Sequence, residues 1–143
     1  MLGEATALAL LEQGLNGPEA DHFEGYFSSR RDAYTRLANA EVIQDSLVTN
    51  ATVIVRAQVS DRLGTVTTND LSMEGLKRAR KQAAEIAGSV AGRPFDSGFL
   101  EQSRDITTNS SFDEATATIS PEARHALLDG PIKQARKAGL LLA

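Results

Sequence analysis

One change of periodicity in the middle of the chain constrains the fold more than any other feature. Apolar residues occupy every second position from Val53 to Val59, and similar alternation recurs before this segment. Successive side chains of a strand point to opposite faces, so the pattern is typical of strands that bury one face. From Asp70 onwards, apolar residues instead recur every three or four positions, as in an amphipathic helix. The chain therefore predicts an α+β fold in which helices cover one face of an antiparallel sheet.

Four or five short strands are expected between residues 21 and 70, joined by tight turns into a β-meander. Asn39-Ala40 interrupts the alternation as a hairpin turn does, because Asn tolerates the positive φ that such a turn requires. A second turn is expected at residues 61–64, which read Asp-Arg-Leu-Gly. The expected strand segments are Phe23–Ser28, Ala33–Leu37, Glu41–Leu47, Val53–Val59 and Thr65–Thr68.

A long central helix is the clearest helical segment of the sequence. Asp70 or Ser72 is suited to be its N-cap, and Glu74 places negative charge in the first turn, where the helix dipole favours it. Gly88 and the segment 92–94, which reads Gly-Arg-Pro, bring the helix to its end. The residues expected to face the sheet are Leu76, Ala79, Ala83, Ile86, Ala87 and Val90.

Helices are also expected at both ends of the chain. Thr6–Leu15 is predicted to be an N-terminal helix that is capped by its first residue, with apolar side chains at helical spacing that include Leu8. Ser120-Pro121 indicates the start of a C-terminal helix, because Ser is a good cap and Pro fits the first turn. Gly130-Pro131 is expected to break or restart this helix, and Gly139 to cap its end.

Two segments near the C-terminus bear on the organisation of the chain. Residues 95–119 show no periodicity, so we expect a long surface connection pinned by aromatic side chains. Leu140–Ala143 is an apolar run that directly follows a helix-ending glycine, as the start of a buried strand does. We therefore expect residues 1–143 to form a single domain, the N-terminal domain of a longer protein. The alternative is a short apolar tail that folds back on the domain.

Composition narrows the class of protein. The 143 residues are 41% apolar and 24% charged, which is a globular balance. Cysteine is absent, which excludes disulfides and thiol chemistry and agrees with a cytoplasmic location. A net charge of −4 argues against a general nucleic-acid binder, because phosphate contacts need concentrated positive charge. No apolar run approaches the roughly 18 residues of a membrane span.

No segment carries a recognisable catalytic, cofactor or metal motif. His22 and His125 are far apart in the sequence and lack the spacing of a zinc site, so both are interpreted as surface or packing residues. The carboxylate pairs Glu19/Asp21 and Asp113/Glu114 suit acid–base or cation chemistry in principle, but solvated loop charges explain them better. We therefore assign no catalytic, cofactor-binding or metal-binding residue.

The best candidate for an interaction surface is a basic cluster on the central helix. Lys77, Arg78 and Lys81 fall on its polar face, and Arg80 flanks the apolar face. An ordinary solvated helix face is the simpler interpretation, because acidic residues lie near the basic ones in the sequence. Arg30-Arg31, at the end of an expected strand, has the same interpretation.

The order of these elements, together with several local strings, resembles the N-terminal domain of the TldD/PmbA family, also known as peptidase U62 or modulator of DNA gyrase. The resemblance covers essentially the whole chain and depends on the ordered set of strings, of which none is diagnostic alone. Ala40 departs from the glycine usual in the hairpin, and residues 50–53 depart from a Gly-rich approach to the next strand. The matching segments are Asp21–Arg31, Asn39–Val42, Gly64–Ser72, the Ser120-Pro121-Glu122 helix start and the Ala138-Gly139 helix end.

This resemblance implies a function through a larger assembly. TldD-type members are similar to zinc metalloproteases with an HExxxH motif in a later domain, which here would lie beyond residue 143. PmbA-type members lack the motif and pair with a TldD-type subunit, and the pair acts on unstructured peptides. The resemblance places no catalytic residue of the family within residues 1–143. Whether the longer protein that contains this chain is an enzyme therefore stays open. Zinc is expected only in the catalytic subunits of the family.

Three hypotheses follow from the sequence. The first is a non-catalytic structural and interaction domain of a cytoplasmic TldD/PmbA-type protease complex. Its expected partners are the rest of its own polypeptide and a paired TldD- or PmbA-type subunit, in a homo- or hetero-oligomer. Unstructured peptides are expected as partners of the whole complex. Nucleic acid and membranes are not expected as partners. The alternative is a stand-alone binding module that uses Lys77, Arg78 and Lys81 for an acidic partner. The third, an enzyme that uses His22 with neighbouring carboxylates, has no supporting spacing.

Overall fold

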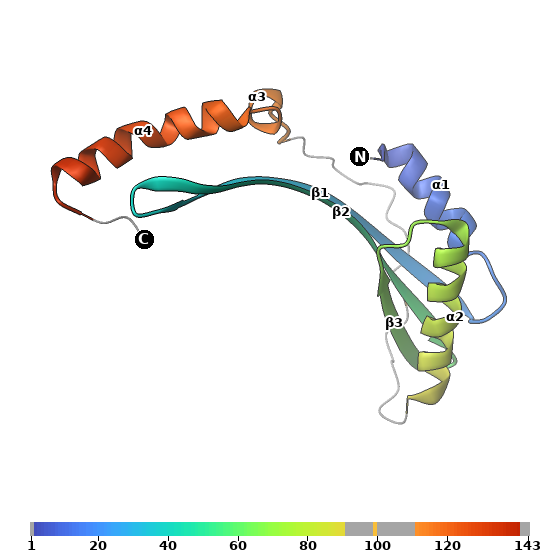
Figure 1. Ribbon diagram of the computed structural model, residues 1–143. Helices are drawn as coiled ribbons and strands as arrows, with labels where there is room; N and C mark the ends of the chain where they lie inside the picture. Colours follow the sequence, from blue (N-terminus) through green and yellow to red (C-terminus); the bar gives the residue numbers. More distant parts are fainter. Residues whose placement is uncertain (1, 91–98, 100–110, 141–143) are drawn as a thin grey trace. The chain divides into compact units, whose positions relative to one another are not determined.

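The computed structural model describes residues 2–90, 99 and 111–140, and its elements are drawn in Figure 1. Its backbone contacts group the chain into unit 1, residues 1–30 and 49–103, and unit 2, residues 31–48 and 104–143. The expected α+β composition, with an N-terminal helix, an antiparallel sheet and C-terminal helices, is confirmed. The elements are α1 (Glu4–Leu15), β1 (His22–Ala38), β2 (Glu41–Val59), β3 (Arg62–Thr68), α2 (Met73–Ser89), α3 (Glu114–Ala117) and α4 (Pro121–Lys137).

The prediction of four or five strands is wrong, since the described residues form three, in the order β1-β2-β3. β1 has 17 residues and β2 has 19, because the polar stretches at residues 29–32 and 49–52 continue the strands where breaks were expected. Neither stretch contains Gly or Pro, so nothing in the local sequence forces a turn. β3 begins at Arg62 and not at Thr65, because the turn occupies Ser60 and Asp61, where Ser60 adopts a φ of 56°.

Unit 1 contains the apolar core of the described chain. β2 pairs antiparallel with β3, and Val55 lies opposite Val66 in the register. The alternation predicted from the sequence is confirmed, because Val53, Val55 and Ala57 are all fully buried. These side chains meet α2 together with leucines of α1, so both helices lie on one face of the sheet (Figure 1).

Helix α2 packs on the sheet through a narrow stripe of small residues. Ser72 is its N-cap, as expected, and its hydroxyl oxygen accepts a hydrogen bond from the Gly75 amide. Leu76 is fully buried, together with the alanine stripe Ala79, Ala83 and Ala87. The expected burial of Ile86 and Val90 is wrong, since they are 36% and 42% exposed. The close approach of the helix at the alanine stripe leaves the larger side chains beside the contact and not within it.

The terminal helices differ from the expectation at the start of α1 and in the middle of α4. α1 begins at Glu4 with Gly3 as its cap, so Thr6 lies inside the helix, and Leu8 is 53% exposed. α4 runs through Pro131 without the expected break, although proline cannot donate the backbone hydrogen bond of that position. Its end is as expected, since Gly139 adopts a φ of +67° and donates to the Arg136 carbonyl.

Two expectations fall largely outside the described residues. Of the irregular connection expected at residues 95–119, residue 99 and residues 111–119 are described, and they include the short helix α3, which was not predicted. Of the expected strand start at residues 140–143, only Leu140 is described, and its side chain is 62% exposed. None of the described helices has the length and apolarity that crossing a membrane requires.

Unit 2 consists of the distal halves of β1 and β2 with α3 and α4. The predicted hairpin turn is confirmed at Asn39-Ala40, where both residues adopt positive φ values of 52° and 59°. Arg136 of α4 donates a hydrogen bond to the Ala40 carbonyl at 3.0 Å. Among the described residues of this unit, only Ala40 and Ala135 are buried apolar residues. Unit 2 therefore depends on polar contacts more than unit 1 does.

Candidate functional site

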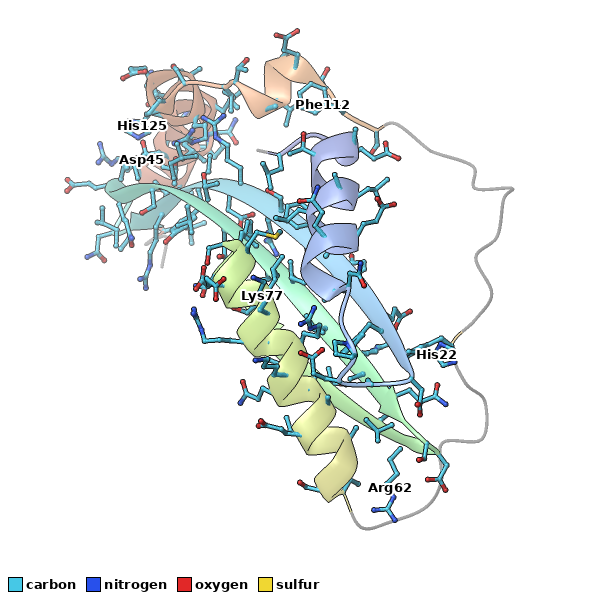
Figure 2. All side chains as sticks on the ribbon, turned by 90° about the vertical axis from the view of Figure 1, so that its right-hand side faces the viewer. His22, Asp45, Arg62, Lys77, Phe112 and His125 are labelled. Carbon is cyan, nitrogen blue, oxygen red and sulfur yellow. The ribbon has the colours of Figure 1, made fainter. Side chains whose placement is uncertain are left out.

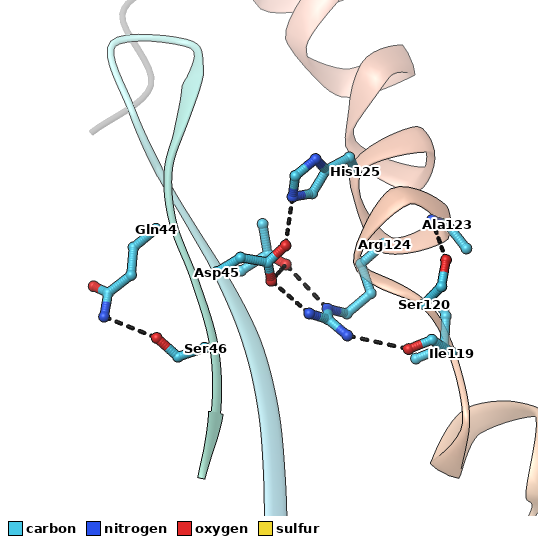
Figure 3. Close-up of polar contacts among 9 residues, drawn as sticks. Gln44, Asp45, Ser46, Ile119, Ser120, Ala123, Arg124 and His125 are labelled. Carbon is cyan, nitrogen blue, oxygen red and sulfur yellow. Dashed lines mark hydrogen bonds and ion pairs between the residues drawn. The ribbon is translucent and has the colours of Figure 1, made fainter.

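A dense polar site lies in unit 2 around the carboxylate of Asp45, on β2 (Figure 3). Two residues in the first turns of α4 approach it, with Arg124 Nη2 at 2.5 Å from Oδ1 and His125 Nε2 at 2.6 Å from Oδ2. Thr35 of β1 donates its hydroxyl to Oδ1 at 2.9 Å. We call these four residues the Asp45 cluster. It ties the start of α4 to both strands of the hairpin.

Every nitrogen of the Arg124 guanidinium has a partner. Nε donates to Thr35 Oγ1 and Nη1 donates to the Ile119 carbonyl, both at 3.1 Å, while Nη2 donates to Asp45. The side chain is only 15% exposed. The three bonds use one N–H of each nitrogen, and the low exposure of the side chain leaves the other two N–H groups poorly accessible to a ligand.

A His–Asp pair can orient a general base when a nucleophilic hydroxyl lies at the second ring nitrogen. Among the described residues, the recorded partner of the His125 ring is Asp45, through Nε2. The one hydroxyl of the cluster, that of Thr35, donates to the same carboxylate. The arrangement is therefore a structural fastening of α4 and lacks the chain of contacts that activates a nucleophile.

Replacing Asp45 by asparagine is expected to loosen α4. The hydrogen bond from Arg124 holds the pKa of the Asp45 carboxyl below its ordinary value of 3.8, against the effect of burial, with help from Thr35 and His125. Because the pKa of Asp45 is lower in the folded state than in the unfolded state, its carboxylate stabilises the folded state fully at a pH above the unfolded-state pKa. This stabilisation is lost as the pH falls through the folded-state pKa. Amide hydrogen exchange by NMR in α4 should therefore be faster in the variant at neutral pH, with a difference that shrinks in acid.

The matched control for this prediction is Asp129→Asn, which removes an exposed carboxylate from the same helix. We expect its α4 amides to exchange at the wild-type rate. Equal protection in Asp45→Asn and wild type at neutral pH would contradict the fastening role.

A second buried polar contact lies in unit 1 and was missed by the sequence interpretation. Arg80 of α2 is only 7% exposed, and it donates to the Asn16 carbonyl and to Glu19 Oε1, the latter at 2.8 Å. Burial raises the pKa of the Glu19 carboxyl, but the hydrogen bond and charge of Arg80 outweigh it and hold this pKa below 4.5. The interpretation of Glu19 as a solvated loop charge is therefore wrong. The pair fastens the α1–β1 connection to α2.

The predicted interaction residues lie on the exposed side of α2, where Lys77 is labelled in Figure 2. Lys77 pairs with Glu74 at 3.1 Å, and Arg78 pairs with Asp70 at 2.5 Å. Lys81 is also exposed. Two of the three cations are thus partly neutralised, one by Glu74 of the same helix and one by Asp70, which lies two residues before the N-cap. An interaction surface at these residues stays a prediction.

The remaining candidates have local structural positions. His22 is exposed at the start of β1 (Figure 2). Asp21 accepts a hydrogen bond from the Ser60 amide at 2.6 Å, and Asp113 caps α3 by accepting from the Thr116 amide at 2.7 Å. Within the described part of the chain, no three His, Cys, Asp or Glu side chains gather as a metal site would require.

Unit 2 contains an open groove of about 670 Å³ beside the Asp45 cluster. Both strands of the hairpin contribute to one wall, with Arg31 to Ala33 from β1 and Leu47 from β2. The other wall comes from α3, the segment after it and the start of α4, including Leu127. No sequence motif indicates this groove, because its two walls are about 80 residues apart in the chain.

Comparison with known proteins agrees with this geometry. Residues 23–87 match the family model described as PmbA/TldA metallopeptidase domain 1. The crystal structure of TldE from Thermococcus kodakarensis is similar to 92% of the chain, with a TM-score of 0.69 and 22% sequence identity. The chain spans 29% of the length of that structure. No curated protein matches the chain. Residues 23–87 are thus identified by the family model as a first domain of the PmbA/TldD type.

Proposed function

We propose that the chain is a non-catalytic structural and interaction domain of a cytoplasmic peptidase complex of the TldD/PmbA type. In this proposal the complex acts on unstructured peptides, and the chain supplies surfaces that hold its subunits together. The described residues offer no ligand set for zinc, so no catalytic step is assigned to them. The zinc of the proposed complex belongs to its catalytic subunits.

The observation that carries this proposal is the exposed apolar surface of the hairpin in unit 2. Tyr34 of β1 and Val48 of β2, which are 45% and 46% exposed, share one face of the hairpin. Ile43 and Leu47, which are 55% and 56% exposed, lie on the other face by strand alternation. Large apolar side chains that gather on an exposed surface are typical of sites that pack against a partner. The scarcity of buried apolar residues in the described part of this unit points the same way.

The hairpin has two faces with different surroundings. Ala33 and Leu47 line the groove formed with α3 and α4. Side chains alternate along a strand, so their neighbours Tyr34 and Val48 lie on the opposite face. We call the face that carries Tyr34 and Val48 the outer hairpin face. It is the proposed contact with a paired subunit.

The double variant Tyr34→Glu, Val48→Asp is expected to prevent assembly without unfolding the chain, because both side chains are exposed. The gene product that contains this chain would be purified with TldD- and PmbA-type subunits of the same cell. Light scattering after size-exclusion chromatography would measure the mass of the complex, and hydrolysis of an unstructured peptide its activity. We expect assembly and hydrolysis with wild type and neither with the variant.

The control is Lys77→Glu, Lys81→Glu, which makes two charge changes on the exposed side of α2, and it should assemble as wild type does. A wild-type gene product that joins neither subunit type would contradict the proposal. Loss of assembly in the α2 control alone would favour the basic helix face of the alternative hypothesis.

A further inference from the structure

The groove of unit 2 has the size and lining of a binding site. Its volume of about 670 Å³ falls within the range of roughly 300–1,000 Å³ typical of ligand pockets. Side chains of Leu47, Ile119, Pro121 and Leu127 make much of its wall apolar. Leu127 is 68% exposed and Leu47 is 56% exposed, so both are available to an incoming group.

Most polar groups of the groove are already engaged within the protein. Arg124 has all its guanidinium nitrogens paired. The Ser120 hydroxyl accepts from the Ala123 amide as the cap of α4, and the Thr118 hydroxyl donates to the Glu114 carbonyl. These groups shape the groove and leave little hydrogen-bonding capacity for a ligand.

Arg31 is the exception among the charged residues of the lining. Its side chain is exposed, and no described carboxylate lies within salt-bridge distance of it. An arginine presents a planar set of donors that matches a carboxylate. The groove therefore combines an apolar wall with the exposed cation of Arg31, beside the Asp32 carboxylate, which already has an interaction partner.

We propose that this groove binds an extended peptide segment in which a large apolar side chain lies next to a carboxylate. The apolar side chain packs between Leu47 and Leu127, and the carboxylate accepts hydrogen bonds from Arg31. This inference rests on the proposed function, which makes unstructured peptides the material handled by the complex, and it adds a place and a preferred composition. Such peptides are open along their length, so one or two residues can enter a groove of this size.

Fluorescence anisotropy would test the groove on the full chain with two labelled, amidated peptides of equal length, one ending in Leu-Leu-Asp and the other in Leu-Leu-Asn. Wild type should bind the Asp peptide more tightly. Arg31→Gln should weaken binding of the Asp peptide about tenfold, as expected for the loss of one charge-assisted contact, and leave binding of the Asn peptide unchanged. Leu127→Ser should weaken the binding of both.

Matched controls come from the same unit outside the groove. Arg36→Gln removes an exposed arginine of β1 from the outer hairpin face, and Phe112→Ser removes a side chain that is 69% exposed and does not line the groove. Both should bind as wild type does. The proposal is overturned if wild type binds neither peptide, or if Arg31→Gln binds the Asp peptide as tightly as wild type.

The assembly experiment separates this inference from the function on which it rests. If the gene product assembles with a family subunit but the chain binds no peptide, the peptide-binding inference is wrong and the proposed function is unaffected. Failure of assembly with intact, Arg31-dependent peptide binding would remove the proposed function and leave a peptide-binding groove.

Discussion

Gly64→Val is expected to destabilise unit 1 by about 3 kcal/mol, at the upper end of the range for overpacking. Gly64 lies in β3 and is buried, and a Cβ added to it would clash with backbone atoms of α2, the Ala83 carbonyl and the Ala87 amide. Backbone atoms cannot rotate away as the end of a side chain can, so α2 must move away from the sheet. Urea unfolding followed by circular dichroism would measure the loss.

The control for this prediction is Gly88→Ala near the end of α2, where a Cβ would meet nothing within 4 Å. Ala is the better helix former by about 1 kcal/mol, so this variant should be slightly more stable than wild type. Wild-type stability in Gly64→Val would show that α2 does not pack on β3 as closely as the structure has it.

Leu76→Ala is expected to cost about 3 kcal/mol of unfolding free energy, within the range for large-to-small changes in a core. Leu76 is fully buried and belongs to the same core cluster as Val53 and Val55 of β2. Its side chain also fills the space next to Gly14 of α1, so its removal opens a cavity where three elements meet. Thermal and urea unfolding would both report the loss.

Ile86→Ala is the informative comparison, because the helical pattern alone places Leu76 and Ile86 on the same face. Ile86 is 36% exposed, and the cost of its truncation should be less than half that of Leu76→Ala. Equal costs would mean that the core extends along α2 as far as the sequence pattern suggested.

Local signals explain the parts of the fold that the sequence predicted well. The alternation from Val53 to Val59 and the caps Ser72 and Ser120 depend on neighbouring residues, and each is present in the structure. Asn39-Ala40 forms the expected turn although Ala lacks the freedom of Gly at positive φ. The continuity of β1 and β2 was missed because polar residues on an exposed strand look like a loop in the sequence.

The polar contacts could not be predicted, because each joins distant parts of the chain. Arg80 and Glu19 are 61 residues apart, and Arg124 and Asp45 are 79 residues apart. In the sequence, Arg80 belongs to a basic run and Asp45 is one polar residue of an alternating strand. Burial and partners, which decide their roles, exist only once the chain has folded.

The same limit applies to the groove. Arg31 was interpreted as an ordinary charge at a strand end, since the segment that completes the groove lies beyond residue 115. The Ser120-Pro121 helix start was recognised, but its position beside β1 and β2 in unit 2 depends on the Asp45 cluster. Sequence patterns therefore predicted the hairpin turn and α4 of unit 2, but not α3 or the surface that these elements form together.

The central claim is that the outer hairpin face of unit 2 holds this chain in a complex of TldD/PmbA-type subunits. Hydrogen–deuterium exchange by mass spectrometry would compare the gene product alone with the same gene product in its complex. The account predicts slower exchange in the complex at residues 31–38 and 41–48. Unchanged exchange in both segments, or protection confined to the exposed side of α2, would contradict it.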